Sequence, residues 1–520
     1  MKNLPLLFIC LLFVVAACDT PVRNANDTAL TVPSIIDLAE IGEIQARSAT
    51  EIEGSYWGIQ ASTLDPELLE KAAEMGVKWT RLPAAWSEIE KEKGKYDWSE
   101  TDKAFDAVLA VGITPFVNLD KSNLLYVDSV TFDDPKLAEV YGYSPQPPTA
   151  TPEAMQAWLN FVEAAISRYK DRIQYWEVWN EPNHRKYWGG PADGQAYGKL
   201  ANATAKVIKK AQPDASVLVG STAGINADFS GKFLAELEPG LADIHTYHTY
   251  SELPEDRIYQ IGKLHKVIAE HYPGLEIWQG ECGYPSHSST TGYRGSSPWG
   301  LNIQAKWLLR QAFVDTYFCR ATLSNYFKLV DDGDRRLKQE RNFLSSTDSI
   351  LGYPERGGSR VRSVGINEKS LLNNPDHTPK PGYHAYQHLC SILDSRYRVA
   401  EVPHEINIED EGVFYGIGAG YADDAYPSVP LLAHYRTEEG QSLLAWWLPW
   451  HAQEYLPEMA RVSLEVTGAS FKEPVLVDLL HGKVYQIESF SADNLNEKTS
   501  FGDLPMADYP LVIMERGDVL

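Results

Sequence analysis

The stretch "TPEAMQAWLNFVEAAISRYKDRIQYWEVWNEPN", residues 151–183, joins a helical pattern to a strand pattern. Thr151 is a favoured N-cap residue, and Pro152 suits the first position of a helix. Apolar side chains then recur at helical spacing, at Trp158, Phe161, Val162, Ala165, Ile166 and Tyr169. The run "IQYWEVW" that follows is short and rich in aromatic and β-branched residues, as strands are. The stretch therefore predicts a helix that leads directly into a buried strand.

The same alternation continues from about residue 55 to about residue 390. Seven more apolar runs have strand character: "YWGIQ", "VKWTRL", "ITPFVNL", "SVLVGS", "DIHTYHTY", "LEIWQGE" and "LSNYFKLV". Eight strands that alternate with helices are typical of an α/β fold of the (β/α)8 type, the TIM barrel. We therefore predict such a barrel over residues 53–395, with catalytic residues at the C-terminal ends of its strands.

After residue 396 the sequence changes to short alternating runs separated by turns, such as "VSLEVTG" and "PVLVDLLHGKVYQI". This pattern predicts a C-terminal β-sandwich domain over residues 396–520. The aromatic cluster "AWWLPWH", residues 445–451, is expected to belong mainly to the core, because alternation buries at least one of Trp446 and Trp447.

The N-terminus has the features of a targeting segment. Lys2 precedes an apolar run that is too short to span a membrane and ends in "VAAC", which resembles the bacterial lipobox. We expect a lipoprotein signal peptide over residues 1–17, lipidation of Cys18 and a tether over residues 18–52. The expected location is the bacterial cell envelope, facing the periplasm or the outer surface, with a lipid anchor as the only membrane contact.

Charge and cysteine content narrow the function classes. A formal net charge of -24 opposes nucleic acids and anionic membrane surfaces as main partners. Once Cys10 and Cys18 are set aside, three cysteines remain, and their spacing is not that of a metal site: Cys282, Cys319 and Cys390. On an extended strand His245 and His248 point to opposite faces and cannot share one ion. We therefore expect neither a metal nor a cofactor.

Two glutamates follow predicted barrel strands, Glu181 after the fourth and Glu281 after the seventh. A barrel brings both to one mouth, and a pair of carboxyl groups in different protonation states is what glycosidic bond cleavage requires. The aromatic neighbours of Glu181 are expected to raise its pKa by desolvation; they are Trp176, Trp179, Tyr187 and Trp188. Arg81 and a tyrosine of the sixth strand are expected to keep Glu281 ionised.

These motifs resemble those of glycoside hydrolase clan A, barrel enzymes that cleave with retention of configuration. The evidence is "WNEPN" after a strand together with a glutamate on the seventh strand. "KPGYHAYQHL" is similar to the closing barrel helix of family 39 and its relatives, which also carry a β-sandwich. The resemblance implies that Glu181 is the acid/base, that Glu281 is the nucleophile, that Asn180 binds the sugar 2-hydroxyl and that Arg81 supports the nucleophile.

The resemblance leaves some site residues open. The His-x-Tyr pattern of the sixth strand fits His248 with Tyr250, and it also fits His245 with Tyr247. In place of the tryptophan common on the eighth strand, the chain offers Tyr326, Phe327 and Lys328, so the identity of the sugar stays open. The candidates for stacking on a sugar are Trp188 and Trp299.

The sequence thus predicts a retaining glycoside hydrolase that acts on β-linked oligo- or polysaccharides through a covalent glycosyl-enzyme. Two alternatives remain: a catalytically silent carbohydrate-binding or polysaccharide-assembly lipoprotein, and a transglycosylase on the same barrel. Linkage, exo or endo action and oligomeric state are not determined by the sequence.

Overall fold

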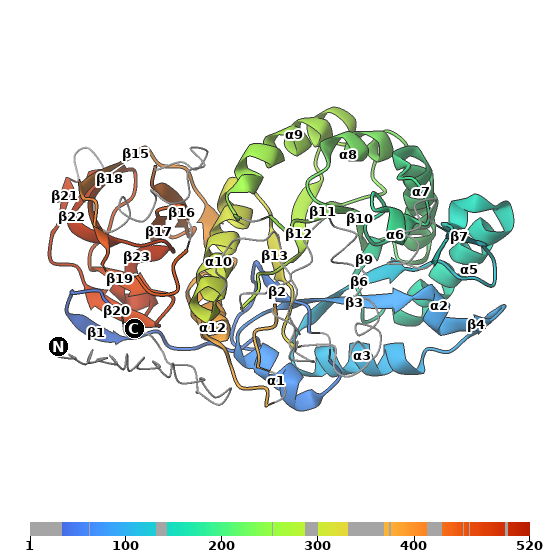
Figure 1. Ribbon diagram of the computed structural model, residues 1–520, viewed down its shortest axis with the longest axis horizontal. Helices are drawn as coiled ribbons and strands as arrows, with labels where there is room; N and C mark the ends of the chain where they lie inside the picture. The colour runs from blue at the N-terminus through green and yellow to red at the C-terminus, as the bar shows by residue number, and fades with distance from the viewer. Residues whose placement is uncertain are drawn as a thin grey trace, which may run out of the picture.

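The computed structural model describes residues 34–520 with gaps at 62, 132–142, 252, 287–299, 331–368, 374–375, 413–428, 451, 457 and 494–497. A barrel surrounded by helices lies beside a smaller group of antiparallel sheets (Figure 1). The expected signal peptide, Cys18 and Trp299 lie outside the described residues.

Eight parallel strands close the barrel, and each coincides with one of the predicted runs. In ring order they are β2 (Trp57–Ile59), β3 (Trp79–Ala85), β6 (Thr114–Asp120), β9 (Tyr175–Val178), β10 (Ser216–Ala223), β11 (Ile244–His248), β12 (Glu276–Cys282) and β13 (Leu323–Tyr326). The predicted α/β class and TIM-barrel architecture are therefore confirmed.

The helices that surround the barrel are α1 (Pro66–Glu74), α3 (Ser99–Ala110), α5 (Pro152–Tyr169), α7 (Gly194–Ala211), α8 (Ala227–Leu234), α9 (Asp256–His271), α10 (Leu301–Phe313) and α12 (Pro381–Ile392). Helix α5 begins as predicted, because the Thr151 side chain accepts a hydrogen bond from the backbone N–H of Ala154. All six apolar positions named for this helix are buried.

Short elements lie on the connections between barrel strands and helices. They are α2 (Trp86–Ile89), the hairpin of β4 (Glu90–Glu92) and β5 (Lys95–Tyr96), the pair β7 (Ser129–Thr131) and β8 (Tyr143–Pro145), the 3-10 turn η1 (Pro148–Ala150), α6 (Arg185–Trp188) and the π-helical turn η2 (Val314–Phe318). Most of them follow β3, β6 and β9, so they build up one side of the barrel's C-terminal face.

The barrel interior changes from apolar to polar along its axis. Near the strand starts a cluster of large side chains fills the barrel, formed by Phe116, Leu218, Ile244, Trp278 and Leu323 with Trp79 and Tyr175 packed against them. Two residues further along β3, β6, β9 and β11, the inward positions are polar: Arg81, Asn118, Glu177 and Thr246. The apolar layer therefore closes the N-terminal end, and the polar groups gather toward the mouth.

Two antiparallel sheets form the C-terminal part, which agrees with the predicted β-sandwich. One sheet has the order β1-β20-β19-β23-β17-β16-β14 and the other β15-β18-β22-β21. Their C-terminal strands are β14 (Arg398–Val399), β15 (His404–Asp410), β16 (Leu431–Arg436), β17 (Ser442–Trp447), β18 (Ala460–Thr467), β19 (Pro474–Asp478), β20 (Lys483–Gln486), β21 (Phe490–Asp493), β22 (Lys498–Met506) and β23 (Leu511–Glu515), followed by the 3-10 turn η4 (Arg516–Asp518). Trp446 and Trp447 are both fully buried, as core residues are.

Part of the expected tether is folded. Strand β1 (Glu40–Glu43) pairs antiparallel with β20, so a segment from before the barrel completes the edge of the C-terminal sheet. Ile36, Ile44 and Ile52 are buried, which gives this segment apolar area to hold it in place. None of the helices in the described chain has the length and apolar character needed to cross a membrane.

Buried polar contacts fasten the sandwich to helix α10. Glu255 pairs with Arg310 of α10 at 2.7 Å and accepts a 2.9 Å hydrogen bond from the Trp447 indole of the sandwich. Glu454 accepts hydrogen bonds from the backbone N–H groups of Asn302 and Ile303 at the start of α10. Because a lost partner would leave a buried charge unpaired, these contacts fix how the two parts pack.

Candidate active site

A pinned turn holds Glu181 at the end of β9. The backbone N–H of Glu181 donates to the carbonyl of Ser221 on β10 (2.9 Å). The Asn183 side chain exchanges two hydrogen bonds with the backbone of Ala223, at 2.9 and 2.8 Å. Trp179 and Glu181 both have positive φ, 71° and 44°, which non-glycine residues adopt at a cost and mostly at functional sites. The turn is therefore fixed by β10 rather than by its own preference.

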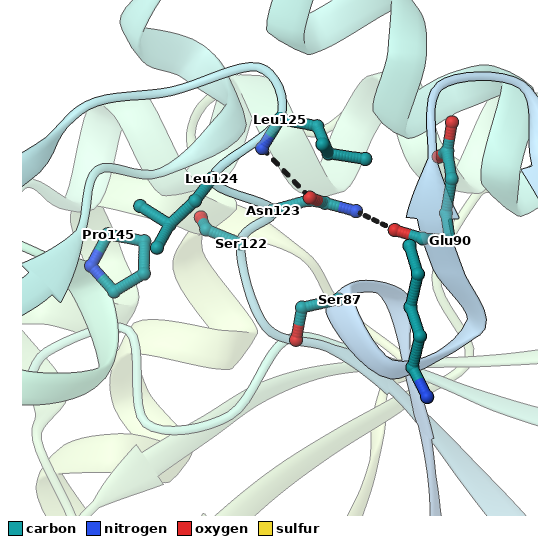
Figure 2. Close-up of a pocket in the computed structure, with 8 residues that line it drawn as sticks. Ser87, Glu90, Ser122, Asn123, Leu124, Leu125 and Pro145 are labelled. Carbon is teal, nitrogen blue, oxygen red and sulfur yellow. Dashed lines mark hydrogen bonds between the residues drawn. The ribbon is translucent and has the colours of Figure 1, made fainter.

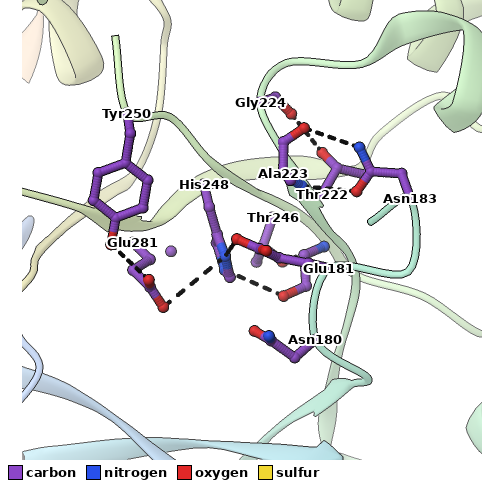
Figure 3. A network of polar contacts seen from close by, with 12 residues as sticks. Asn180, Glu181, Asn183, Thr222, Ala223, Gly224, Thr246, His248, Tyr250 and Glu281 are labelled. Atoms are coloured by element: carbon purple, nitrogen blue, oxygen red, sulfur yellow. Dashed lines mark hydrogen bonds and ion pairs between the residues drawn. The ribbon is translucent and has the colours of Figure 1, made fainter. Parts of the chain in front are cut away.

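Glu281 lies near the end of β12, and two donors bind its carboxylate. The Tyr250 hydroxyl donates to Oε1 at 2.6 Å, and an Arg81 Nη1–H donates to Oε2 at 3.3 Å. Figure 3 shows Glu281 and Glu181 on either side of His248. One oxygen of each glutamate and Nδ1 of His248 lie within 4.8 Å of one another. The barrel therefore brings both predicted carboxyl groups to one mouth, and Arg81 and a tyrosine bind Glu281 as the sequence predicts.

His248 connects Glu181 to the wall of the barrel. Its Nδ1 lies 3.1 Å from Glu181 Oε1 (Figure 3). Its Nε2 lies 3.2 Å from Ser221 Oγ. Arg81 also donates to Ser221 Oγ, at 3.1 Å. An arginine can only donate, so the Ser221 hydroxyl is left to donate to Nε2, and Nδ1–H donates to an ionised Glu181. Through Ser221 and His248, Arg81 thus orients the acid/base candidate as well as Glu281.

The pKa of Glu181 is lowered, and the prediction of a raised pKa was wrong. Burial does raise it, but the hydrogen bond from His248 and the electrostatic attraction of His248, His184 and Arg81 outweigh burial. Two of the aromatic rings expected to desolvate the carboxyl group, those of Trp179 and Trp188, pack in the core. Trp179, for example, lies edge-to-face against Trp158 in the core.

Glu177 is a site residue that the sequence analysis missed. It is fully buried, and it accepts hydrogen bonds from Arg81 Nε (2.7 Å), Asn118 Nδ2 (3.0 Å) and Thr246 Oγ1 (2.6 Å). Arg81 in turn donates to Asn180 Oδ1 at 2.9 Å. The signal was a glutamate at an inward position of the apolar strand run "YWEVW", where a charge needs a partner. Glu177 thus anchors the arginine that contacts Glu281, Asn180 and Ser221.

The structure decides between the two His-x-Tyr fits. His248 and Tyr250 face the mouth, as described above. His245 points outward, where its Nε2 lies 2.9 Å from Ser230 Oγ of helix α8, and burial lowers its pKa to about 3. Tyr247 lies two residues after His245 on the same strand, so its side chain also points outward, and it is fully buried. The two histidines therefore point to opposite faces, as predicted.

The aromatic candidates for sugar contact are changed by the structure. Trp188 is only 3% exposed and packs edge-to-face against Trp179 and Tyr197, so the expectation that it stacks on sugar was wrong. Its place at the end of the short helix α6 turns the ring into the barrel wall. On the eighth strand, Tyr326 is core, whereas Phe327 is half-buried and lies edge-to-face with Tyr250, at 6.3 Å between ring centroids. Phe327, directly after β13, thus contacts the tyrosine that binds Glu281.

The same groups could meet the distance requirement of a metal site, because Glu181, His248 and Glu281 each offer a ligand atom. Each of these groups already has a partner, since His248 Nδ1 lies 3.1 Å from Glu181 Oε1 and Glu281 Oε2 accepts from Arg81 at 3.3 Å. The chemistry of the set is that of two carboxyl groups with an imidazole between them, which fits proton transfer and nucleophilic attack. The expectation that no metal is needed stays a prediction.

A cavity of about 470 Å³ lies among the connections that follow β3 and β6, on the same face of the barrel (Figure 2). Its lining residues are Ser87, Glu90, Lys91, Ser122, Asn123, Leu124, Leu125 and Pro145. The Asn123 side chain accepts from the N–H of Leu125 (3.0 Å) and donates to the carbonyl of Glu90 (2.7 Å). Both bonds join the Asn123 side-chain amide to backbone groups of the protein, so they hold this side of the mouth in place.

Comparison with known proteins shows what the chain is similar to. Residues 82–235, less than a third of the chain, match the model for Glycosyl hydrolases family 39. An aryl-phospho-beta-D-glucosidase BglA of Bacillus subtilis (strain 168) is 28% identical over 218 residues, 38% of this chain and 42% of its own length. A beta-xylosidase of Geobacillus stearothermophilus is 29% identical over 140 residues, 25% of each chain. The matches thus span less than half of these relatives.

Solved structures extend the likeness in fold to most of the chain. A family 39 glycoside hydrolase from the gut symbiont Bacteroides cellulosilyticus WH2 has a TM-score of 0.59 at 18% identity, covering 88% of this chain and 80% of its own. A monomeric beta-xylosidase from Caulobacter crescentus CB15 has a TM-score of 0.52 at 18% identity, covering 92% and 98%. At such identities these two show the fold alone. Taken with the family match, they confirm the predicted resemblance: the chain is most like family 39 of the clan A glycoside hydrolases.

Proposed function

We propose that the protein is a retaining β-glycosidase with Glu281 as nucleophile and Glu181 as acid/base. The observation that carries the proposal is the approach of the two carboxyl groups, whose nearest oxygens lie within 4.8 Å at one mouth. Retaining glycosidases hold the two carboxyl groups about 5–5.5 Å apart, whereas inverting enzymes leave about 6.5–9.5 Å for a water molecule. The close pair therefore favours direct attack on the sugar.

The first step starts from the state in which Glu181 is protonated. A Glu281 oxygen bonds to the anomeric carbon as the bond to the leaving oxygen breaks, and Glu181 gives its proton to that oxygen. In the second step Glu181 takes a proton from water, the water oxygen bonds to the anomeric carbon, and Glu281 leaves as a carboxylate. Tyr250 and Arg81 hold the attacking carboxylate by charge-assisted hydrogen bonds. His248 orients Glu181 in both steps.

The proposed substrates are β-linked oligo- or polysaccharides with glucose- or xylose-like sugars. The support comes from the relatives, which include glucosidases and xylosidases, together with the strongly acidic composition of the chain, which repels anionic polymers. No step in the mechanism draws on a metal or a cofactor.

A panel of 4-nitrophenyl β-glycosides tests the proposal. We expect turnover of at least one member, loss of turnover in Glu281→Gly, and its return with azide as the α-glycosyl azide. Azide with Glu181→Ala should instead give the β-glycosyl azide, because that anion attacks the covalent intermediate. Glu100→Gln, on the surface of α3, serves as the matched control and should be unaffected. Sugar binding without turnover on the whole panel would favour a silent binding protein, and product analysis at high acceptor concentration separates a transglycosylase.

We also propose that the mature chain is anchored to the bacterial envelope through a lipid on Cys18. The support is the sequence "VAAC" at the end of a short apolar run. Metabolic labelling with an alkynyl fatty acid should mark the wild-type chain and not Cys18→Ser. Equal labelling of both, or none of either, contradicts the anchor.

A further inference from the structure

Asp120 is a carboxylate at the mouth that no hydrogen-bond donor among the described residues binds. Its Oδ1 has almost no accessible surface, and no hydrogen bond or ion pair reaches its carboxyl group from the residues that the structure describes. A buried carboxylate oxygen without a hydrogen-bond donor has lost its hydration without a replacement, which destabilises the folded state. Burial raises the pKa of Asp120 and the charge of the neighbouring Lys121 acts to lower it, but the exposed ammonium group forms its ion pair with Glu88, at 3.9 Å. An unbound acceptor at this position is therefore one that a ligand can satisfy.

The alternation of β6 shows where Asp120 points. Asn118 faces the barrel interior, since it donates to Glu177, and Asp120 lies two residues further toward the C-terminal end. On the neighbouring strand β3, Pro83 pairs with Asn118 and is exposed, so the barrel is open above this level. The charges of Arg81 and Glu177 both act on Asp120. Asp120 therefore faces the same mouth as the two catalytic glutamates.

The ring order of the strands places Asp120 across the mouth from the nucleophile. In the closed barrel β6 is the third strand and β12 the seventh, so three strands lie between those of Asp120 and Glu281 in either direction. A sugar whose anomeric carbon meets Glu281 extends its far side toward β6. In a pyranose ring the far side carries the hydroxyl groups at carbons 3 and 4.

We propose that Asp120 accepts hydrogen bonds from the 3- and 4-hydroxyl groups of the sugar that reacts with Glu281. The inference rests on the proposed function and deepens it. A carboxylate accepts from two vicinal hydroxyl groups at once, and such charge-assisted bonds are stronger than neutral ones. The site therefore selects neutral sugars whose hydroxyl groups on that side are free, and it excludes uronic acids with their carboxylate toward β6. A free 4-hydroxyl belongs to the terminal sugar of a 1,4-linked chain, so the contact favours release from chain ends.

The test compares Asp120→Asn with wild type on a 4-nitrophenyl β-glycoside that the enzyme turns over and on its 3-deoxy and 4-deoxy analogues. We expect Asp120→Asn to lower kcat/KM roughly 10- to 100-fold on the parent glycoside, the range for one hydrogen bond to a charged group. For wild type, kcat/KM should be lower by a similar factor on a deoxy analogue than on the parent. For Asp120→Asn, kcat/KM should be nearly the same on the deoxy analogue as on the parent, because the contact is already lost. Asp128→Asn, an exposed carboxylate on the connection after β6, is the matched control and should match wild type on all three.

The inference is overturned if Asp120→Asn lowers kcat/KM, relative to wild type, by the same factor on the parent glycoside and on both deoxy analogues. It is also overturned if the variant has the wild-type kcat/KM on the parent. Either result leaves the proposed function intact. If wild type turns over no glycoside, the proposed function fails, and binding of methyl β-D-glucoside and methyl β-D-xyloside by calorimetry decides the inference. Weaker binding to Asp120→Asn than to wild type then supports the contact, and equal binding refutes it.

Discussion

Replacing Glu177 with glutamine should destabilise the barrel and disturb the site at once. Glu177 is fully buried, and Arg81, also buried, pairs with it at 2.6 Å. Glutamine keeps the shape and the acceptor oxygen but removes the charge, so Arg81 loses its main partner. Breaking a buried pair in this way costs about 3–5 kcal/mol. With an unfolding entropy near 2.1 cal/mol/K per residue over a barrel of some 340 residues, the melting temperature should fall by roughly 4–7 °C.

Differential scanning calorimetry of the barrel transition measures this change, and steady-state kinetics measures its effect on the site. Because Arg81 also contacts Glu281, Asn180 and Ser221, we expect kcat/KM to fall by about tenfold or more. Glu177→Asp keeps the charge and should recover part of both losses. The control is Glu100→Gln, whose pair with Lys103 is exposed and should leave the melting temperature unchanged. A Glu177→Gln variant as stable as this control would refute the reasoning.

Three further changes test the site. Tyr250→Phe removes the 2.6 Å bond to Glu281 and should lower kcat roughly 10- to 100-fold at an unchanged melting temperature; an unchanged kcat contradicts the role given to Tyr250. His248→Leu removes the hydrogen bond that lowers the pKa of Glu181, so burial should then raise that pKa. The alkaline limb of the kcat/KM pH profile should therefore move to higher pH. A shift to lower pH is inconsistent with Glu181 as the acid. Burial raises the pKa of Asp120 from 3.8 to about 6, so its ionisation opposes folding fully above pH 6 and not at all below pH 4. Thermal melts of Asp120→Asn should therefore match wild type at pH 4 and show a more stable protein than wild type at pH 7, by at most about 3 kcal/mol at 1.36 kcal/mol per pKa unit. A difference that does not change with pH would count against an unbound Asp120 whose Oδ1 is buried.

The fold was accessible from the sequence because its signals are local and repeated. Each of the eight barrel strands is a short apolar run, and Thr151 with Pro152 marks the start of α5 as these residues do in peptides. Strand β1 was missed because its partner β20 lies more than 400 residues further along the chain. No local pattern distinguishes a tether from a strand that pairs across such a distance.

The site was predictable to the level of strand ends and not to the level of side-chain partners. A barrel places Glu181 and Glu281 at one face whatever their neighbours, so their convergence follows from topology. The pKa of Glu181 depends instead on which groups point at it. The aromatic residues near Glu181 in the sequence are mainly tryptophans, which predicted an apolar environment. The backbone turn instead directs the carboxylate to His248 on another strand. Trp188 was misjudged for the same reason.

The most direct test of the account is to inactivate the enzyme with a 2-deoxy-2-fluoro β-glycoside that carries a good leaving group. Mass spectrometry of the digested protein then identifies the residue that carries the sugar. Retaining hydrolysis through Glu281 predicts one sugar bound per chain, on the peptide that contains Glu281. A sugar attached to any other residue, or turnover that releases the α-anomer first and leaves no adduct, would contradict the account.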